Sequence, residues 1–249
     1  MIHPSAIIDP AAELDENVSV GPFCVIGADV HIGSGSEIGP HVVIKGATRI
    51  GQDNRVYQFA SVGEDPQDKK YAGERTLLKI GDRNVIREFV TINRGTLQDE
   101  GLTSIGNDNL FMAYVHVAHD CSIGNNVIMA NAASLGGHVQ IDDWAILGGF
   151  TLVHQFSRVG CYSFSAMGSA IGKDVPPYVM VDGKPAKPRG INAEGLKRHG
   201  FSAQDLGRIR RAYKILYQTG LPLEQAISEI ANMQDETPVL QPMVKFLQS

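Results

Sequence analysis

A six-residue repeat of apolar residues constrains the fold of this chain more than any other feature. From Ile8, every sixth position carries a branched aliphatic residue without a break as far as Val62. The same phase resumes at Ile80, slips by one residue before Ile105, and continues past one serine to Ile171. A helix needs a period of about 3.6 and an ordinary strand a period of about 2, so neither explains a period of six. Short strands joined by tight corners do explain it.

Glycine keeps the same register as this apolar column. Of the 27 glycines, 13 stand directly after a column position. Because glycine tolerates backbone angles that other residues avoid, we expect a sharp corner there. Three six-residue segments then make one triangular coil, and residues one coil apart stack at the β spacing of about 4.8 Å. The repeat therefore predicts a parallel β-helix of roughly nine to ten coils.

Two segments interrupt the repeat. Residues 64–78 place Asp68 and Glu74 where apolar residues are due, and residues 94–101 absorb the one-residue slip. Both segments are predicted to be excursion loops, and loops that stand out from a rigid scaffold often carry function. The β-helix with its two loops is predicted to span residues 1–189.

Helical signals replace the repeat in the remainder of the chain. Ser202 is predicted to be the N-cap of a helix, and Asp205 three residues later completes a variant of the capping box. A second helix is expected to start near Leu223, and Thr237 and Pro238 are expected to cap and open a third. Residues 190–249 are therefore predicted to form a C-terminal α-helical domain on a chain that is otherwise mainly β.

Composition and charge argue against several classes of protein. The net charge of −5 disfavours general nucleic-acid binding, which prefers a basic surface. No stretch approaches the roughly 18 apolar residues that a membrane span needs, and the first residues lack a secretory signal. The three cysteines, Cys24, Cys121 and Cys161, form no metal-type pair. We therefore expect a cytoplasmic protein that neither binds nucleic acid nor inserts stably into a membrane.

The coil length gathers four of the eight histidines at one edge. Val117, Leu135 and Val153 are one coil apart and should stack on one face. The four histidines that lie within three residues of these positions are His116, His119, His138 and His154. Asp120 precedes His138 by one coil, and Gln155 follows His119 by two. A single histidine in a turn is usually polar surface, but four on one edge indicate a functional site.

Histidine suits proton transfer from a hydroxyl, because its ordinary pKa of about 6.5 lies close to neutral pH. Asp120 could orient His119 if the local turn brings these adjacent side chains together, since adjacent strand residues point to opposite faces. Cys121 lies nearby, but a packed and inert thiol is the simpler interpretation. Direct attack by a substrate hydroxyl would need no protein nucleophile.

A zinc site is the alternative interpretation of these histidines. Among β-helices with a six-residue repeat, the gamma-class carbonic anhydrases bind zinc through three histidines. Their site uses two subunits and a pair of histidines five positions apart, whereas His116 and His119 are three apart. We therefore expect no metal and no other cofactor.

Nine short segments carry a resemblance that is much narrower than the repeat. They read YQFASVGE at 57–64, QDKKYAGE at 67–74, IGDRN at 80–84, AHDC at 118–121, GHV at 137–139, VHQF at 153–156, DVPPY at 174–178, NAEGLKR at 192–198 and GFS at 200–202. Through them, nearly the whole chain resembles the UDP-N-acetylglucosamine O-acyltransferases that open lipid A synthesis in Gram-negative bacteria. The repeat resembles that of the hexapeptide-repeat proteins, whose coils wind left-handed against the usual right-handed crossover rule.

The resemblance implies a role for each candidate residue. His119 is the general base that deprotonates the glucosamine 3-hydroxyl, Asp120 is its orienting carboxylate, and the Gly137 backbone N–H is the donor to the thioester oxyanion. His138 contacts the acyl 3-hydroxyl or the reacting centre. Contacts with the sugar and its phosphates are implied for His116, Asp68 and Lys70, and contacts on the nucleotide side for His154, Gln155, Asn192, Glu194 and Arg198. Without the resemblance, Asp68 and Lys70 would read as a solvated loop.

The resemblance also implies the partners. The donor is a 3-hydroxyacyl form of acyl carrier protein, the acceptor is UDP-N-acetylglucosamine, and the family forms homotrimers with sites between subunits. Met167 stands where the family has a chain-length ruler, which implies acyl chains of about ten carbons, although such a methionine could equally be plain packing. The basic run from Arg208 to Lys214 would suit an acidic carrier, although such a run is usually a solvated helix face.

Two other functions stay open at this point. The related N-acyltransferase acts on a sugar amine, but it usually has a separate N-terminal sugar-binding domain, whereas here the repeat starts by Ile8. A non-catalytic β-helix scaffold would leave the histidine edge unexplained.

Two positions depart from the family pattern, since Asn93 stands in place of a histidine and His199 replaces one member of a basic pair.

Overall fold

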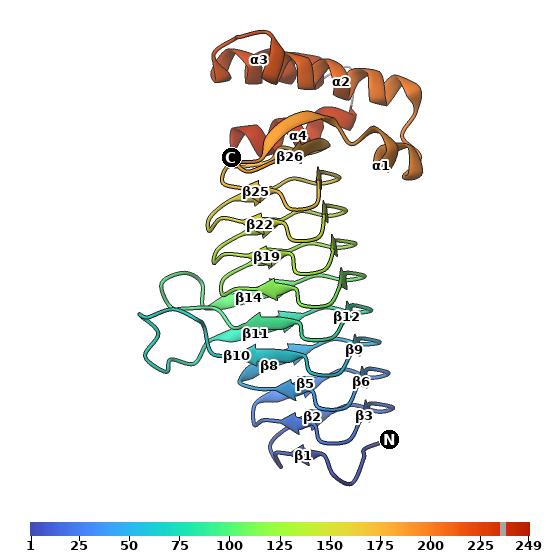
Figure 1. Cartoon of the computed structure of the whole chain (residues 1–249), viewed down its shortest axis with the longest axis vertical. Coiled ribbons are helices and arrows are strands. Elements are labelled where there is room, and N and C mark those ends of the chain that lie inside the picture. Colours follow the sequence, from blue (N-terminus) through green and yellow to red (C-terminus); the bar gives the residue numbers. More distant parts are fainter. Residues whose placement is uncertain (235–237) are drawn as a thin grey trace.

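The chain folds into a left-handed parallel β-helix that carries helices at its C-terminal end (Figure 1). The computed structural model describes residues 1–234 and 238–249. Within these residues, 27 short strands form three sheets, parallel except for the last strand pair, and four α-helices follow. The fold class predicted from the repeat and its resemblance is confirmed.

The three sheets are the three faces of the β-helix. Sheet 1 contains β1 (Ile7–Ile8), β4 (Val25–Ile26), β7 (Val43–Ile44), β10 (Ser61–Glu64), β13 (Thr91–Asn93), β16 (His116–Val117), β19 (Ser134–Leu135), β22 (Leu152–Val153) and β25 (Ala170–Ile171). Sheet 2 contains β2 (Glu13–Leu14), β5 (Val30–Ile32), β8 (Ala47–Ile50), β11 (Leu77–Ile80), β14 (Leu102–Ile105), β17 (Ser122–Ile123), β20 (Gln140–Ile141) and β23 (Arg158–Val159). Sheet 3 contains β3 (Ser19–Val20), β6 (Glu37–Ile38), β9 (Arg55–Val56), β12 (Val85–Ile86), β15 (Leu110–Phe111), β18 (Ile128–Met129), β21 (Ile146–Leu147), β24 (Phe164–Ser165), β26 (Val179–Asp182) and β27 (Lys187–Ile191).

Strands of neighbouring coils pair in the register that the repeat predicts. Ile8 pairs with Ile26, so a plain coil holds 18 residues. Across the first loop Val62 pairs with Ile92, a step of 30 residues, and across the second Ile92 pairs with Val117, a step of 25. The loops therefore add 12 and 7 residues to their coils. Twelve is two repeats and keeps the phase, whereas seven is one repeat plus one and explains the slip.

The glycines after the column are explained by close packing between coils, and the prediction that they adopt special backbone angles is wrong. Of these thirteen glycines, all of them described, only Gly63 has a positive φ. The left-handed corner residue comes three positions after the column and is usually not glycine, as at Phe89 (φ 59°) and Asp108 (φ 60°). A Cβ on Gly81 would lie 2.7 Å from the carbonyl oxygen of Gly106. The backbone of the next coil therefore leaves no room for a side chain at most of these glycines, with Gly27 and Gly172 as the exceptions.

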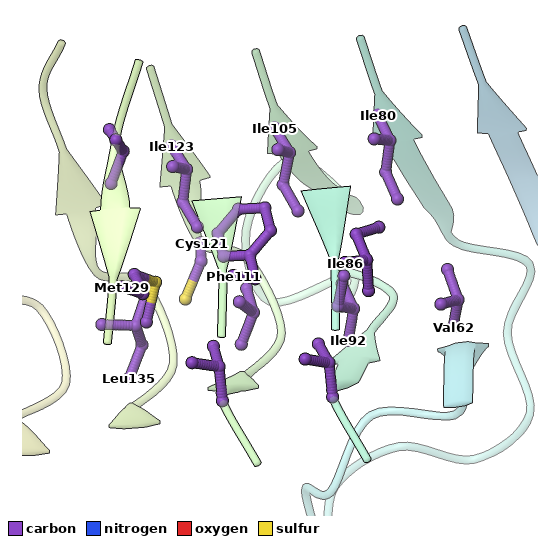
Figure 2. Packing of buried hydrophobic residues seen from close by; sticks show 14 of the residues in the cluster. Val62, Ile80, Ile86, Ile92, Ile105, Phe111, Cys121, Ile123, Met129 and Leu135 are labelled. Carbon is purple, nitrogen blue, oxygen red and sulfur yellow. The ribbon is translucent and has the colours of Figure 1, made fainter. Parts of the chain in front are cut away.

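Column residues fill the interior of the β-helix. Figure 2 shows Ile86, Ile92 and Ile105 pointing inward, each from a different sheet. Cys121 belongs to the same buried cluster. Burial raises the pKa of the Cys121 thiol to about 12, so the thiol stays protonated at neutral pH and is a poor nucleophile.

Three buried asparagines form a ladder inside one corner of the β-helix. The backbone N and Nδ2 of Asn84 both donate to Asn54 Oδ1, at 2.9 and 3.0 Å. Asn109 repeats the pattern on Asn84 Oδ1, at 3.0 and 2.9 Å, and Val127 N donates to Asn109 Oδ1 at 2.7 Å. Each side chain therefore satisfies backbone groups of the adjacent coil that would otherwise be buried without a partner.

The C-terminal region contains α1 (Ala193–Arg198), α2 (Ala203–Gln218), α3 (Leu223–Gln234), the 3-10 helix η1 (Pro238–Leu240) and α4 (Gln241–Gln248). The predicted capping box is confirmed, because Ser202 Oγ accepts from Asp205 N at 3.1 Å and Asp205 Oδ2 accepts from Ser202 N at 3.0 Å. α3 starts at Leu223 as expected. Pro238 opens η1, whereas Thr237 lies outside the described residues. None of the described helices is long and apolar enough to cross a membrane.

Two side chains tie the helical region to the β-helix. Tyr178 is buried after the last full coil, and its hydroxyl donates to the carbonyl oxygen of Val239 at 2.8 Å. Arg158 in β23 donates to the carbonyl oxygen of Phe246 in α4 at 3.1 Å. The proposed division between residues 189 and 190 falls inside β27, which pairs with β26, so the domain boundary stays a prediction.

Replacing Asn84 by alanine should destabilise the protein by about 2–4 kcal/mol, because it leaves the backbone N–H of Asn109 and the carbonyl oxygen of Gly106 without these partners in a buried site. Thermal unfolding followed by circular dichroism should show a lower midpoint. The control is Lys79→Ala, an exposed position in the same coil, which should unfold close to the wild type. An unchanged midpoint for Asn84→Ala would contradict the structural role of the ladder.

Candidate active site

The predicted histidines lie at the corner where sheet 1 turns into sheet 2, which we call the histidine corner. Asp120, His138 and Phe156 occupy its successive coils, each three residues after a sheet 1 column position. All three have left-handed backbones, with φ of 59°, 60° and 65°. The rings of His138 and Phe156 stack with centroids 4.4 Å apart. The 18-residue coil therefore brings these side chains together as the sequence predicts.

His119 and Asp120 form a hydrogen-bonded pair at this corner. His119 Nδ1 lies 2.8 Å from Asp120 Oδ2, and the two side chains are 13% and 1% exposed. The left-handed turn at Asp120 makes this possible, because it removes the strand alternation that would point adjacent side chains apart. With Nδ1 bonded to the carboxylate, His119 carries its proton there and leaves Nε2 free to accept another.

Gly137 lies against the free edge of the His119 ring. A Cβ on Gly137 would come within 2.6 Å of His119 Cε1 and 2.8 Å of Nε2, so only glycine allows this approach. The carbonyl oxygen of Gly137 accepts from Phe156 N at 3.1 Å. Its N–H donates to no group in the described part of the chain. A free backbone donor therefore stands beside the imidazole nitrogen that can take a proton.

The loop of residues 94–101 supplies two contacts that our sequence analysis missed. Thr96 donates from its backbone N to Asp120 Oδ1 at 2.7 Å and from its hydroxyl to Oδ2 at 2.6 Å. Asp99 Oδ2 lies 2.8 Å from His138 Nδ1. The loop was predicted to be a functional excursion, but it has no periodicity from which its contacts could be derived. A pocket of about 430 Å³ opens beside Asp99, Asp120, His138 and Phe156.

His116, His154 and Gln155 also lie near this corner. His116 projects from β16, and its Nδ1 bonds Thr91 Oγ1 at 2.7 Å. Burial lowers the pKa of His116, and a charge on His119 acts in the same direction, so His116 favours its neutral form. His154 and Gln155 are exposed two coils beyond His119, where His154 Nδ1 bonds the Gln155 carbonyl oxygen at 3.0 Å.

Both excursion loops leave the β-helix at the histidine corner (Figure 1). Asp68 and Lys70 lie on the first loop, where Lys70 N donates to Asp68 Oδ1 at 2.9 Å. Asn93, which departs from the family pattern, joins the bases of the two loops by donating to the carbonyl oxygen of Asp65 at 2.6 Å. No hydrogen bond or ion pair within the described residues links Asp68 or Lys70 to His119.

The nucleotide-side candidates on α1 lie at a different corner, where sheet 2 turns into sheet 3. Asn192 caps α1, and its Nδ2 donates to the carbonyl oxygen of Tyr162 at 3.0 Å. Glu194 and Arg198 are exposed on the same helix. His199, the second departure, packs edge-on against Trp144 with ring centroids 4.5 Å apart. A single chain therefore does not bring these residues to the histidine corner.

Met167 lies at the third corner, where sheet 3 turns into sheet 1, and it is 76% exposed. Its neighbour on the preceding coil is Gly149, whose Cβ position would lie 4.0 Å from Met167 Cγ. The exposed outer face of sheet 1 separates Met167 from the histidine corner. The residues predicted for one site thus occupy all three corners of the chain.

His119, Asp120 and His138 are also placed so that they could hold a metal ion, with ligand atoms within 4.8 Å of one another. Their donors and acceptors, however, already form a hydrogen-bonded network. Asp120 accepts bonds from His119 and from both donors of Thr96, and His138 Nδ1 pairs with Asp99. An ion would have to displace at least one of these bonds. The arrangement fits an oriented general base better than a metal centre.

Family models match two parts of the chain. The description "Udp N-acetylglucosamine O-acyltransferase; Domain 2" matches residues 174–249. The description "Bacterial transferase hexapeptide (six repeats)" matches residues 11–46 and 102–137. The first match covers the last coil and the helical region, and the second covers parts of the β-helix.

Full-length relatives agree with these matches. The acyl-[acyl-carrier-protein]–UDP-N-acetylglucosamine O-acyltransferase of Janthinobacterium sp. (strain Marseille) is 58% identical, over 96% of this chain and 91% of that protein. The protein of the same name from Herminiimonas arsenicoxydans is 54% identical, over 100% and 97%. The solved LpxA of Acinetobacter baumannii is 46% identical with a TM-score of 0.97, over 99% of this chain and 96% of that one. By sequence and by structure, this chain belongs to the family of acyl-[acyl-carrier-protein]–UDP-N-acetylglucosamine O-acyltransferases.

Proposed function

We propose that this enzyme transfers a 3-hydroxyacyl chain of about ten carbons from acyl carrier protein to the glucosamine 3-hydroxyl of UDP-N-acetylglucosamine, with His119 as general base. This is the first step of lipid A synthesis. The names of the full-length relatives support the donor and the acceptor. The observation that carries the mechanism is the His119–Asp120 pair, whose free imidazole nitrogen faces the backbone of Gly137.

The reaction needs one proton acceptor and one oxyanion donor. The sugar 3-hydroxyl oxygen attacks the thioester carbonyl carbon while His119 Nε2 takes the hydroxyl proton. The carboxylate of Asp120 stabilises the imidazolium that forms. When the tetrahedral intermediate collapses, the carbon–sulfur bond breaks, and the imidazolium returns its proton to the leaving thiolate of the carrier. The protein supplies a group for each of these steps, so the proposed mechanism needs no metal or organic cofactor.

The Gly137 N–H is the donor to the oxyanion. It is free of protein acceptors among the described residues and lies beside the His119 ring. A backbone donor fixed by the coil needs no reorganisation when charge develops, and removing such a donor in comparable enzymes costs about 3–4 kcal/mol of transition-state stabilisation. The His138 ring meets the His119 ring edge-on, with centroids 5.2 Å apart, so His138 lies beside the proposed reacting centre.

The complete site is shared between neighbouring subunits of a homotrimer. One chain holds the histidine corner, Met167 and α1 at three different corners, which supports substrate contacts from more than one chain. An apolar surface on the outer face of sheet 1 and its border with sheet 3 supports this arrangement. It includes Tyr114, Phe150, Leu152 and Met167, which are 53–76% exposed. Such surfaces usually mark subunit interfaces or ligand grooves, and the acyl chain would lie along this one.

The carrier protein docks through basic residues near the helical region. The basic residues between positions 184 and 214 are Lys184, Lys187, Arg189, Lys197, Arg198, Arg208, Arg210, Arg211 and Lys214. They stand out because the whole chain has a net charge of −5. An acidic carrier would be steered to such a surface, and its binding should weaken as the salt concentration rises.

With UDP-N-acetylglucosamine and 3-hydroxyacyl carrier proteins as substrates, the purified protein should form the 3-O-acylated sugar nucleotide. His119→Ala should lower kcat by at least about 100-fold, because the reaction loses its base. The matched control is His31→Ala on sheet 2, where the histidine pairs with Asp15 away from the histidine corner. Product formation by His119→Ala at the wild-type rate would refute the general-base mechanism.

Met167→Gly should shift the preferred donor from about ten carbons to longer chains, because it removes the side chain that would end the acyl groove. Transfer rates with a series of donors of about 8 to 16 carbons would measure the shift. Met167→Leu keeps most of the side-chain volume and should keep the wild-type preference. If the wild type used fourteen-carbon and ten-carbon donors equally well, Met167 would not act as a ruler.

A further inference from the structure

We propose that Asp99 is a positioning residue that holds His138 so that His138 Nε2 binds the hydroxyl of the 3-hydroxyacyl donor. This pairing makes the site prefer hydroxylated over unsubstituted acyl chains. The inference deepens the proposed function and rests on it. Asp99 acts through His138 and does not itself touch the reacting atoms.

The contact between Asp99 and His138 is short and its geometry is restrained. Asp99 Oδ2 lies 2.8 Å from His138 Nδ1. The His138 ring stacks on Phe156 at 4.4 Å and meets His119 edge-on at 5.2 Å, so 14% of the His138 side chain is exposed. A ring that is packed on two sides cannot turn freely. The carboxylate that bonds Nδ1 therefore also decides where Nε2 points.

The same short loop holds both histidine–carboxylate pairs. Thr96 donates twice to Asp120, the partner of His119. Asp99 N and Gly101 N then donate to the carbonyl oxygen of Thr96, at 3.2 and 3.0 Å, and close the loop into a compact turn. Asp99 is thereby fixed relative to the catalytic pair, although its own side chain is 46% exposed.

Asp99 sets the protonation pattern of the His138 ring. A carboxylate only accepts hydrogen bonds, so the proton must lie on His138 Nδ1. This leaves Nε2 to bond a group of the substrate. Nε2 lies 3.8 Å from Asp120 Oδ2, too far for a hydrogen bond but on the side of the ring that faces the catalytic pair.

A hydroxyl is the substrate group that suits Nε2. It can donate to the lone pair of a neutral ring or accept from a protonated one, whereas the methylene of an unsubstituted chain can do neither. A site built around a hydrogen bond to a hydroxyl rejects the analogue without it, because the polar group of the protein is left unpaired. Asp99 would therefore act on the choice of donor more than on the sugar acceptor.

Kinetics with two donors of equal chain length, one with and one without the 3-hydroxyl, test this role. Asp99→Ala should lower kcat/KM for the hydroxylated donor by roughly 10–100-fold and leave the unsubstituted donor and the KM for UDP-N-acetylglucosamine nearly unchanged. Asp99→Glu should restore part of the preference. Gln98→Ala, an exposed neighbour in the same loop, is the control and should behave like the wild type.

A double-mutant cycle shows whether Asp99 acts through His138. In a His138→Gln background, Asp99→Ala should cause no further change in the ratio of the two donors. Two results would overturn the inference: an equal loss for both donors in Asp99→Ala, or a further loss of preference in the His138→Gln background. Asp99 would then only stabilise the loop. If the wild type transferred neither donor, the proposed function itself would fail together with the preference.

The pairing can also be measured without any substrate. In ¹⁵N-histidine-labelled protein, with His138→Gln to assign the signal, the ring of His138 should carry its proton on Nδ1. In Asp99→Ala the neutral ring should gain the tautomer with the proton on Nε2. A wild-type protein whose His138 already has the Nε2–H tautomer would contradict the pairing, whatever the activity assays find.

Discussion

Hydrogen bonds between the backbones of successive coils are the constraint on which the rest of this structure depends. They join residues one coil apart, as in the bond from Gly136 N to the Val153 carbonyl oxygen at 2.9 Å. The coils are so close that most of the glycines after the column have no room for a Cβ, as at Gly106, where a Cβ would lie 2.6 Å from the Gly124 carbonyl oxygen. The position of a residue in the repeat therefore fixes its coil and the face on which its side chain lies. A site can thus be built from residues far apart in the chain.

At the histidine corner, the candidate site depends both on this regular coil spacing and on a loop that interrupts it. The coil spacing places Gly137 against His119, while the left-handed turn brings Asp120 to its neighbour. The second loop then adds Thr96 and Asp99, which no repeat supplies. Rigid coils thus hold the proposed base and the proposed oxyanion donor, and the second loop adds hydrogen bonds to Asp120 and to His138. Sites in which loops add contacts to residues held by a rigid scaffold are common in proteins.

The sequence predicts the periodic part of this arrangement and little of the rest. The apolar column, the stacking of the histidine corner and the capping box at Ser202 follow from spacing, and the structure confirms them. Contacts that depend on the path of a loop, such as Asp99 with His138, have no periodic signal. The asparagine ladder at Asn84 was also missed, because buried amides look like surface residues in a single sequence. Residues of α1 lie at another corner because α1 follows β27, and its N-cap Asn192 bonds the Tyr162 carbonyl oxygen where sheet 2 turns into sheet 3.

The most direct test of the central claim is the kcat of Gly137→Ala. Gly137 has no left-handed φ, so alanine fits its backbone, but the added methyl would press within 2.6 Å of the His119 ring. We predict a fall in kcat of at least about 100-fold with little change in the unfolding temperature, because the base moves from its place beside the oxyanion donor. Gly27→Ala, where a Cβ would meet its nearest neighbour at 3.5 Å, should keep wild-type activity. Wild-type kcat in Gly137→Ala would contradict the account of a base and an oxyanion donor held face to face on successive coils.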